Sequence, residues 1–96
     1  MVVKGYIVKN TQRIDGHHVR MARAGLKLSL KELAELSNVS ANTISRIESG
    51  LPAIVSTLEA LRRTFEDQGV QFPADGSVLL SQEAVKAREL RKPTED

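Results

Sequence analysis

The 96-residue sequence predicts a single, mainly α-helical domain: a compact bundle of four helices with short β elements at its ends. Its length is that of one small domain. Apolar residues recur at helical spacing, and capping residues and glycines divide them into short helices. We expect an N-terminal strand and linker in 1–16, the helices in 17–69, a small hairpin in 70–80 and a weakly ordered helical tail in 81–96.

The first part of the chain combines a strand with a helix. Val2 to Lys9 (VVKGYIVK) is rich in β-branched and aromatic residues and is too short for a helix, so a strand is expected there. After the linker, a helix is expected from His17 to Leu26. Its apolar residues share one face: Val19, Ala22 and Leu26.

A second helix is predicted to begin after Ser29, because Ser29 and Glu32 form a capping box. It should end at Ser37-Asn38, since Asn tolerates the left-handed conformation of a tight turn. Its inward residues are Leu30, Leu33 and Ala34.

A third helix is predicted between Ser40, which caps it, and Gly50, which ends it. Its two sides differ in chemistry. Ile44 and Ile47 lie on one side, and the other side carries small or polar residues at helical spacing: Asn42, Ser45, Arg46 and Ser49.

A second capping box, Ser56 with Glu59, predicts a fourth helix that ends at Gly69. Its inward residues are Leu58, Leu61 and Phe65. The preceding segment contains Leu51, Ile54 and Val55, which suit the core and a partner surface equally well.

After residue 69 the pattern indicates a hairpin whose turn contains Asp75-Gly76. An isolated two-stranded hairpin is not stable alone, and its apolar residues should not be left exposed. We therefore expect it to form the interface of a homodimer through Val70, Phe72, Val78 and Leu80. Ser81 caps a last helix that lacks a clean apolar stripe and should be weakly anchored, and Pro93 to Asp96 should fray.

Two short helices joined by a tight turn, the second with a small polar outer face, are what a helix-turn-helix requires. The major groove of DNA admits a helix only if its outer side chains are short and bond base edges. Arg46 suits guanine, Asn42 suits adenine and Ala41 suits a thymine methyl group.

Residues 28–50, LSLKELAELSNVSANTISRIESG, resemble the helix-turn-helix of the lambda-repressor and Cro-like (XRE-type) regulators, whose pattern is roughly LSQxxLAxxxGVSxxTISxIExG. With the flanking helices, the resemblance covers about residues 17–69. It implies a fold in which the third helix contacts bases and the start of the second lies on a phosphate. By position, the base-facing residues are Ala41, Asn42, Ser45 and Arg46, and the phosphate candidates are Lys31, Ser40 and Thr43. Ser49, on the outer face of the third helix, is a further backbone candidate.

The sequence departs from that pattern at three places. Leu30 replaces a glutamine that helps to hold the DNA backbone, so this contact is lost or supplied by Lys31. The loop after Gly50 is apolar rather than basic, and Asn38 replaces the usual turn glycine. Other phosphate contacts are therefore expected from Arg20, Arg23 and Lys27, or from Lys4, Lys9 and Arg13.

Composition excludes several kinds of site. The chain has no cysteine, which excludes disulfides and thiolate metal sites, and its three aromatic residues are too few for stacking on single strands. His17 and His18 are adjacent, point about 100° apart on a helix and are interpreted as surface residues rather than metal ligands. We expect no metal, no cofactor and no catalysis; Glu48 is interpreted as structural because nothing is placed to react with it. No membrane span or signal peptide is evident, so a cytoplasmic location is expected.

The charge distribution supports a nucleic-acid partner for the first half of the chain. Residues 1–50 contain eight Lys or Arg and four Asp or Glu, whereas 51–96 contain six and eight. The sequence thus predicts a homodimeric, sequence-specific regulator of double-stranded DNA that acts as a repressor on a palindromic operator. The alternative is an antitoxin or antagonist that binds a partner protein through its C-terminal half and regulates its own operon.

Overall fold

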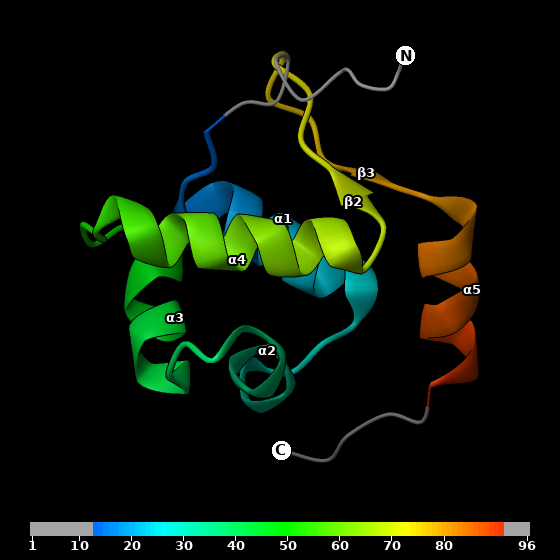
Figure 1. The fold of residues 1–96 in the computed structure, drawn as a ribbon, viewed down its shortest axis with the longest axis horizontal. Helices are drawn as coiled ribbons and strands as arrows, with labels where there is room; N and C mark the ends of the chain where they lie inside the picture. Colours follow the sequence, from blue (N-terminus) through cyan, green and yellow to red (C-terminus); the bar gives the residue numbers. More distant parts are fainter. Residues whose placement is uncertain (1–12, 92–96) are drawn as a thin grey trace.

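A computed structural model describes residues 13–91 and has the predicted fold class, a mainly helical bundle with a small sheet (Figure 1). The expected strand Val2–Lys9 and the expected frayed end Pro93–Asp96 lie outside the described residues. In chain order, the described elements are α1 (Gly16–Leu26), α2 (Leu30–Ser37), α3 (Ala41–Glu48), α4 (Val55–Asp67), β2 (Val70–Gln71), β3 (Leu79–Leu80) and α5 (Gln82–Leu90).

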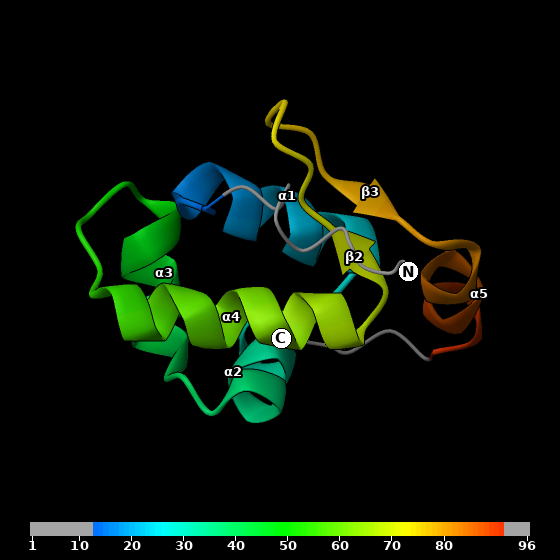
Figure 2. The same ribbon diagram turned by 45° about the horizontal axis from the view of Figure 1, so that its top comes forward.

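The core lies where α1, α2, α3 and α4 meet. α4 crosses in front of α1, with α2 and α3 below it and the two strands beside its C-terminal end (Figures 1 and 2). The predicted inward stripes are confirmed, because their central residues are almost completely buried: Val19, Ala22, Leu26, Leu33, Ile44, Ile47, Leu61 and Phe65. Leu30, Ala34 and Leu58 pack against this cluster while remaining partly exposed.

The start of α1 corrects the interpretation of His18 as a surface residue, because the side chain is buried. Asp15 is the N-cap of a reciprocal capping box, in which the His18 amide donates to Asp15 Oδ1 at 3.3 Å and the Asp15 amide donates to His18 Nδ1 at 3.1 Å. The ring also packs edge-on against Phe72, with centroids 6.1 Å apart. The spacing of apolar residues does not predict this cap, which orients the His18 side chain toward the core. His17 is exposed, as predicted.

The predicted cap of α2 and the predicted turn between α2 and α3 are both confirmed. The Ser29–Glu32 capping box is present, with Glu32 N–H donating to Ser29 Oγ at 3.0 Å. Asn38 adopts the left-handed conformation with φ of 61°. Ser40 caps α3. Gly50, with φ of 94°, ends it.

The start of α4 differs from the prediction that Ser56 and Glu59 form a capping box. The helix begins at Val55, its N-cap is Ile54, and no side chain bonds to the cap. Ser56 therefore lies inside the first turn, where its hydroxyl cannot occupy the cap position. The Glu59 carboxylate accepts hydrogen bonds from Arg62 instead.

The hairpin packs against the helices of its own chain, so no second chain is needed to cover Val70 and Phe72. β2 and β3 are antiparallel, with Val70 opposite Leu80. Val70 and Phe72 are only 1% and 2% exposed, because they pack into the core between the helices. Val78 and Leu80 pack against the core while partly exposed. The segment from 70 to 80 thus completes the hydrophobic core of a single chain.

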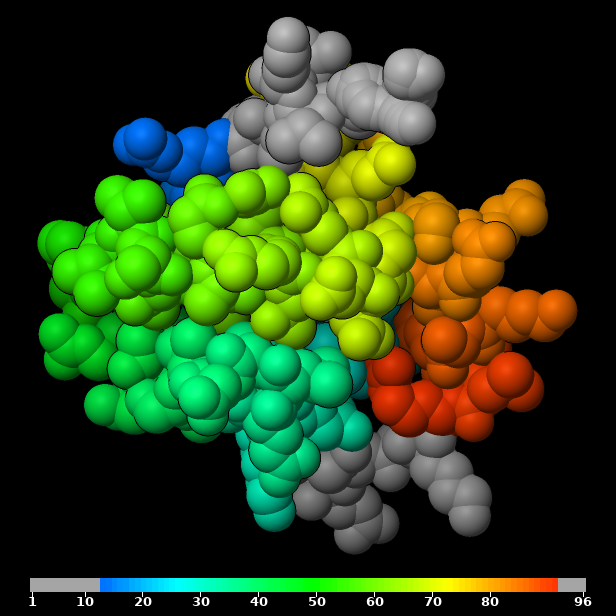
Figure 3. Space-filling model, viewed as in Figure 1, coloured from blue at the N-terminus to red at the C-terminus, as the bar shows by residue number. Residues whose placement is uncertain are grey.

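α5 stands at the side of the bundle, beyond the strands (Figures 1 and 3). Ser81 caps it, as expected, by accepting from the Ala84 amide at 3.0 Å. Only Ala84 is buried, while Leu90 is 79% exposed. Polar contacts supplement this small apolar contact, because Arg88 donates to the Gly25 carbonyl at 3.0 Å and Arg91 donates to that of Leu26.

Candidate nucleic-acid interface

The outer face of α3 is a row of exposed side chains held on a rigid helix. Ile44 and Ile47 anchor the opposite side in the core, each at most 3% exposed. The helix is fixed at both ends. At its C-terminus the Leu51 amide donates to the Arg46 carbonyl and the Gly50 amide to that of Ile47, which is the hydrogen-bond pattern of a glycine-terminated helix.

Of the predicted base-facing residues, Asn42, Ser45 and Arg46 are exposed, while Ala41 is half-buried at the first position of α3. Among the described residues, the side chains of Asn42 and Arg46 have no hydrogen-bond or ion-pair partner. Their donors and acceptors are therefore available to a ligand. Ser49 continues the row, with its Oγ donating to the Ser45 carbonyl at 2.9 Å.

Two hydroxyl groups lie together at the start of α3. Ser40 Oγ accepts from the Thr43 amide at 3.1 Å and donates to Thr43 Oγ1 at 2.8 Å. The Ser40 hydroxyl proton is thus already used, whereas the Thr43 proton remains available for an external acceptor. Lys31 is exposed in the first turn of α2.

Arg23 links three parts of the fold. Its Nε and Nη2 donate to the two carboxylate oxygens of Glu48 at 2.8 and 2.9 Å, and Nη1 donates to the Leu28 carbonyl at 3.0 Å. The Glu48 side chain is 9% exposed. Glu48 therefore has the structural role that was expected, with Arg23 as its partner. Each guanidinium nitrogen of Arg23 already donates a hydrogen bond within the protein.

The two other backbone candidates of α1 lie at opposite ends of the helix. Arg20 is exposed, and its Nη1 donates to the Glu48 carbonyl at 3.1 Å, beside the outer face of α3. Lys27 follows α1 in a left-handed conformation with φ of 57°. Its charge acts on α5, where the pKa of Glu89 is lowered by the hydrogen bond and charge of Arg88 and further by Lys27. The structure does not bring Lys27 to Arg20.

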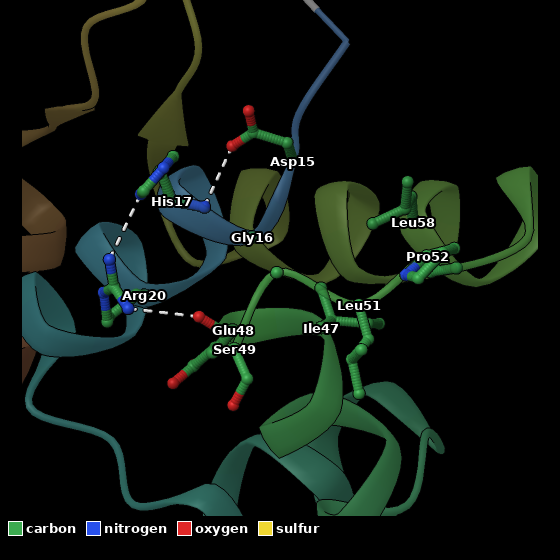
Figure 4. Close-up of a pocket in the computed structure, with 12 residues that line it drawn as sticks. Asp15, Gly16, His17, Arg20, Ile47, Glu48, Ser49, Leu51, Pro52 and Leu58 are labelled. Atoms are coloured by element: carbon green, nitrogen blue, oxygen red, sulfur yellow. Dashed lines mark hydrogen bonds between the residues drawn. The ribbon is translucent and has the colours of Figure 1, made fainter.

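A cavity of about 570 Å³ opens between the start of α1 and the loop that joins α3 to α4 (Figure 4). Asp15, His17 and Arg20 line its polar end, and Leu51, Pro52 and Leu58 line its apolar end. Gly16 is required here, because a Cβ at this position would overlap the Ile47 carbonyl oxygen. Within residues 13–91, no group of three or more His, Asp or Glu is placed to hold a metal ion.

The apolar residues around the connection between α3 and α4 were expected either in the core or on a partner surface. Leu51, Ile54 and Val55 are 45%, 68% and 56% exposed, so they are not core residues. We call these three residues the loop patch. It lies directly after the C-terminal end of α3.

Two features of this region were missed from the sequence. The Arg23–Glu48 pair had a signal, because Arg23 follows Val19 by four residues and so shares the inward face of α1. An inward arginine in a small domain requires a buried acid. The approach of His17 to Arg20 had only the weaker signal of i, i+3 spacing.

Residues 19–64 match the family model described as helix-turn-helix, and the match covers most of α1, all of α2 and α3, and most of α4. This segment is a helix-turn-helix domain of the lambda-repressor-like (XRE) type. The resemblance in the α2–turn–α3 region is thereby confirmed. No curated protein and no solved structure gives a significant match to the chain. No helix within the described part of the chain is long and apolar enough to cross a membrane.

Proposed function

We propose that this helix-turn-helix protein is a sequence-specific transcriptional repressor that binds a palindromic operator in double-stranded DNA as a homodimer. The observation that carries the proposal is the outer face of α3, where Asn42 and Arg46 are exposed and without partners on a helix fixed in the core. With α3 in the major groove, Arg46 pairs with guanine and Asn42 with adenine. Ser45 and Ala41 complete the base contacts.

The DNA backbone contacts come from residues that surround this face. Lys31, at the start of α2, and the Thr43 hydroxyl are positioned for phosphates, and Ser49 and Arg20 lie at the other end of α3. Arg23 acts through the fold, since its guanidinium holds Glu48. The apparent affinity should fall with salt, with a slope of about −0.9 per neutralised phosphate.

The homodimer forms through the loop patch rather than through the hairpin. A single α3 offers too few base contacts for tight specific binding, whereas two-fold pairing doubles them. The loop patch contains three exposed apolar residues and adjoins α3, so its self-association would set two α3 helices side by side. The hairpin residues Val70 and Phe72 are already covered by their own protomer.

A second function is favoured by α5. Leu90 is the most exposed large apolar side chain in the described chain, on a helix with only one buried residue. A partner protein that covers Leu90 would make this protein an antitoxin or antagonist that regulates its own operon. Co-purification with the product of an adjoining reading frame, lost in Leu90→Asp, supports this function.

Selection of bound duplexes from a random pool with the purified protein tests the main proposal. The expected result is an enriched two-fold symmetric sequence whose half-sites are about 10 base pairs, or a multiple of this, apart. No enrichment and no shift of any duplex at low salt would contradict it.

A further inference from the structure

The polar end of the cavity holds two side chains in direct contact (Figure 4). Arg20 Nη2 lies 3.1 Å from His17 Nδ1, while Arg20 Nη1 donates to the Glu48 carbonyl. A guanidinium has no acceptor, so this contact is a hydrogen bond only when His17 Nδ1 accepts it, which requires a neutral ring with its proton on Nε2. Both side chains are exposed, and we call them the His17–Arg20 pair.

The charges around His17 cancel when its ring is neutral. Asp15 and Glu48 are negative, and Arg20 and Arg23 are positive. The cavity residues contributed by the α3–α4 loop and by α4 carry no charge: Gly50, Leu51, Pro52, Ala53 and Leu58. Uptake of a proton by His17 gives this cluster a net positive charge. The protonated ring can no longer accept from Arg20, so two cationic donors face the same space.

The Asp15 carboxylate repels an anion at this site less strongly than a carboxylate without hydrogen-bond partners would. Its Oδ1 accepts hydrogen bonds from the His17 and His18 amides and contacts the His18 ring. Burial acts to raise the pKa of Asp15, but these amide bonds and the charge of His18 together lower it. The carboxylate is therefore already satisfied by the start of α1.

The His17–Arg20 pair lies where the outer face of α3 ends. Ser49 belongs to both, as the last residue of that face and a lining residue of the cavity. Ser49 follows Asn42 by seven residues, or about 10 Å along a helix axis. The major groove is about 12 Å wide, so the far end of a helix whose other end contacts bases lies beside a sugar-phosphate strand.

We propose that protonated His17 and Arg20 bind one phosphodiester of the operator, so that DNA binding takes up a proton. The inference rests on the proposed function, because it requires α3 to lie in the major groove. Histidine changes charge within the range of pH 5 to 8. Since only the protonated ring adds a charge at this phosphate, affinity for DNA rises as the pH falls through that range.

The test compares DNA affinity at about pH 8 and about pH 6 at constant salt, the range in which histidine titrates. The native protein should bind the selected operator roughly three- to tenfold more tightly at the lower pH, the size of one added charge contact at an exposed site. His17→Gln, which remains polar but cannot be charged, should lose most of that difference. Lys86→Gln, which removes an exposed charge on α5, should keep the difference in affinity between the two pH values.

Ring signals of His17 in nuclear magnetic resonance spectra separate the possible anions. Operator DNA should shift these signals and favour the protonated ring, whereas inorganic phosphate at similar phosphate concentration should have little effect. Equal pH dependence in His17→Gln and the native protein would overturn the inference while leaving the proposed function intact. A response to inorganic phosphate without pH-dependent DNA binding would also overturn it. Absence of DNA binding at both pH values would instead contradict the proposed function.

Discussion

Arg23 and Glu48 form a two-bond ion pair that joins α1 to the last residue of α3, with Nε to Oε2 at 2.8 Å and Nη2 to Oε1 at 2.9 Å. The same guanidinium donates to the Leu28 carbonyl in the connection to α2. One arginine therefore fixes the relative positions of the three helices on which the proposed DNA contacts depend. The pair is partly shielded from water, which makes its disruption costly.

Removing only one partner of this pair should destabilise the domain. Arg23→Ala leaves the Glu48 carboxylate, 9% exposed, without its counter-charge, so the free energy of unfolding should fall by about 3 kcal/mol. Urea denaturation measures this change. The double variant Arg23→Met with Glu48→Leu should recover most of the stability, because no unpaired charge remains. Loss of less than about 0.5 kcal/mol in Arg23→Ala, the range of ordinary surface substitutions, would show that the pair is unimportant for stability.

The capping carboxylate of Asp15 should give the domain an acid-dependent stability. Its pKa is lowered in the folded protein: burial raises it, and the hydrogen bonds from His18 and His17 with the charge of His18 outweigh that effect. A carboxyl group with a lowered pKa in the folded protein stabilises the fold at pH values above its unfolded-state pKa of about 3.9. This stabilisation is lost as the pH falls through the folded-state pKa. Asp15→Ala should lose about 1 kcal/mol at neutral pH, typical of a cap residue.

The difference in stability between the native protein and Asp15→Ala should therefore shrink below about pH 4, where both chains approach the same charge. Thermal denaturation across this pH range measures it. Asp15→Asn is the control, because its amide oxygen keeps the cap but not the charge. A stability difference that grew as the pH fell would contradict the assigned role.

The loop patch should control self-association. Ile54→Asp places a charge on a side chain that is 68% exposed, so it should yield a folded monomer with unchanged helical circular dichroism and weakened binding to a two-fold site. Sedimentation velocity measures the state of association. Leu90→Asp is a matched control on α5, 79% exposed, and should remain a dimer. If Ile54→Asp sediments as a dimer while Leu90→Asp does not, the interface involves α5.

The two hydroxyls at the start of α3 should differ in their effect on DNA binding. Thr43→Val removes the proton available for a phosphate, so it should weaken binding to all sequences, by roughly 1 kcal/mol for a single hydrogen bond. Ser40→Ala removes the N-cap and should mainly lower stability, again by about 1 kcal/mol. Binding and denaturation measurements on both variants separate these effects. A larger loss of affinity in Ser40→Ala, measured where both variants are folded, would reverse the assignment.

The helices and the outer face of α3 could be predicted from the sequence because they depend on local signals. The Ser29–Glu32 box, the left-handed Asn38 and the terminating Gly50 each act within four residues of the helix end that they define. Spacing of apolar residues then fixes which side of each helix is buried. The start of α4 was misplaced because Ser56 and Glu59 have the right spacing, yet Glu59 bonds to Arg62 one turn later.

The remaining features depend on contacts between residues distant in sequence. His18 looked like a surface residue because its partner Phe72 lies 54 positions later, after the hairpin has folded back. The same packing covers Val70 and removes the reason to assign dimerisation to the hairpin. The exposure of the loop patch could not be predicted either, because an apolar segment alone does not show whether other elements cover it.

Binding of Arg46→Ala to the selected operator and to its single-base variants is the most direct test of α3 as the base-contacting helix. We predict a loss of about 1 to 3 kcal/mol that is confined to one base position per half-site, where the variant no longer discriminates between bases. Lys31→Ala, measured in parallel, should weaken binding to every sequence alike and reduce the salt slope by about one contact. Equal losses for Arg46→Ala on operator and unrelated DNA would contradict the account, because they would place Arg46 on a phosphate.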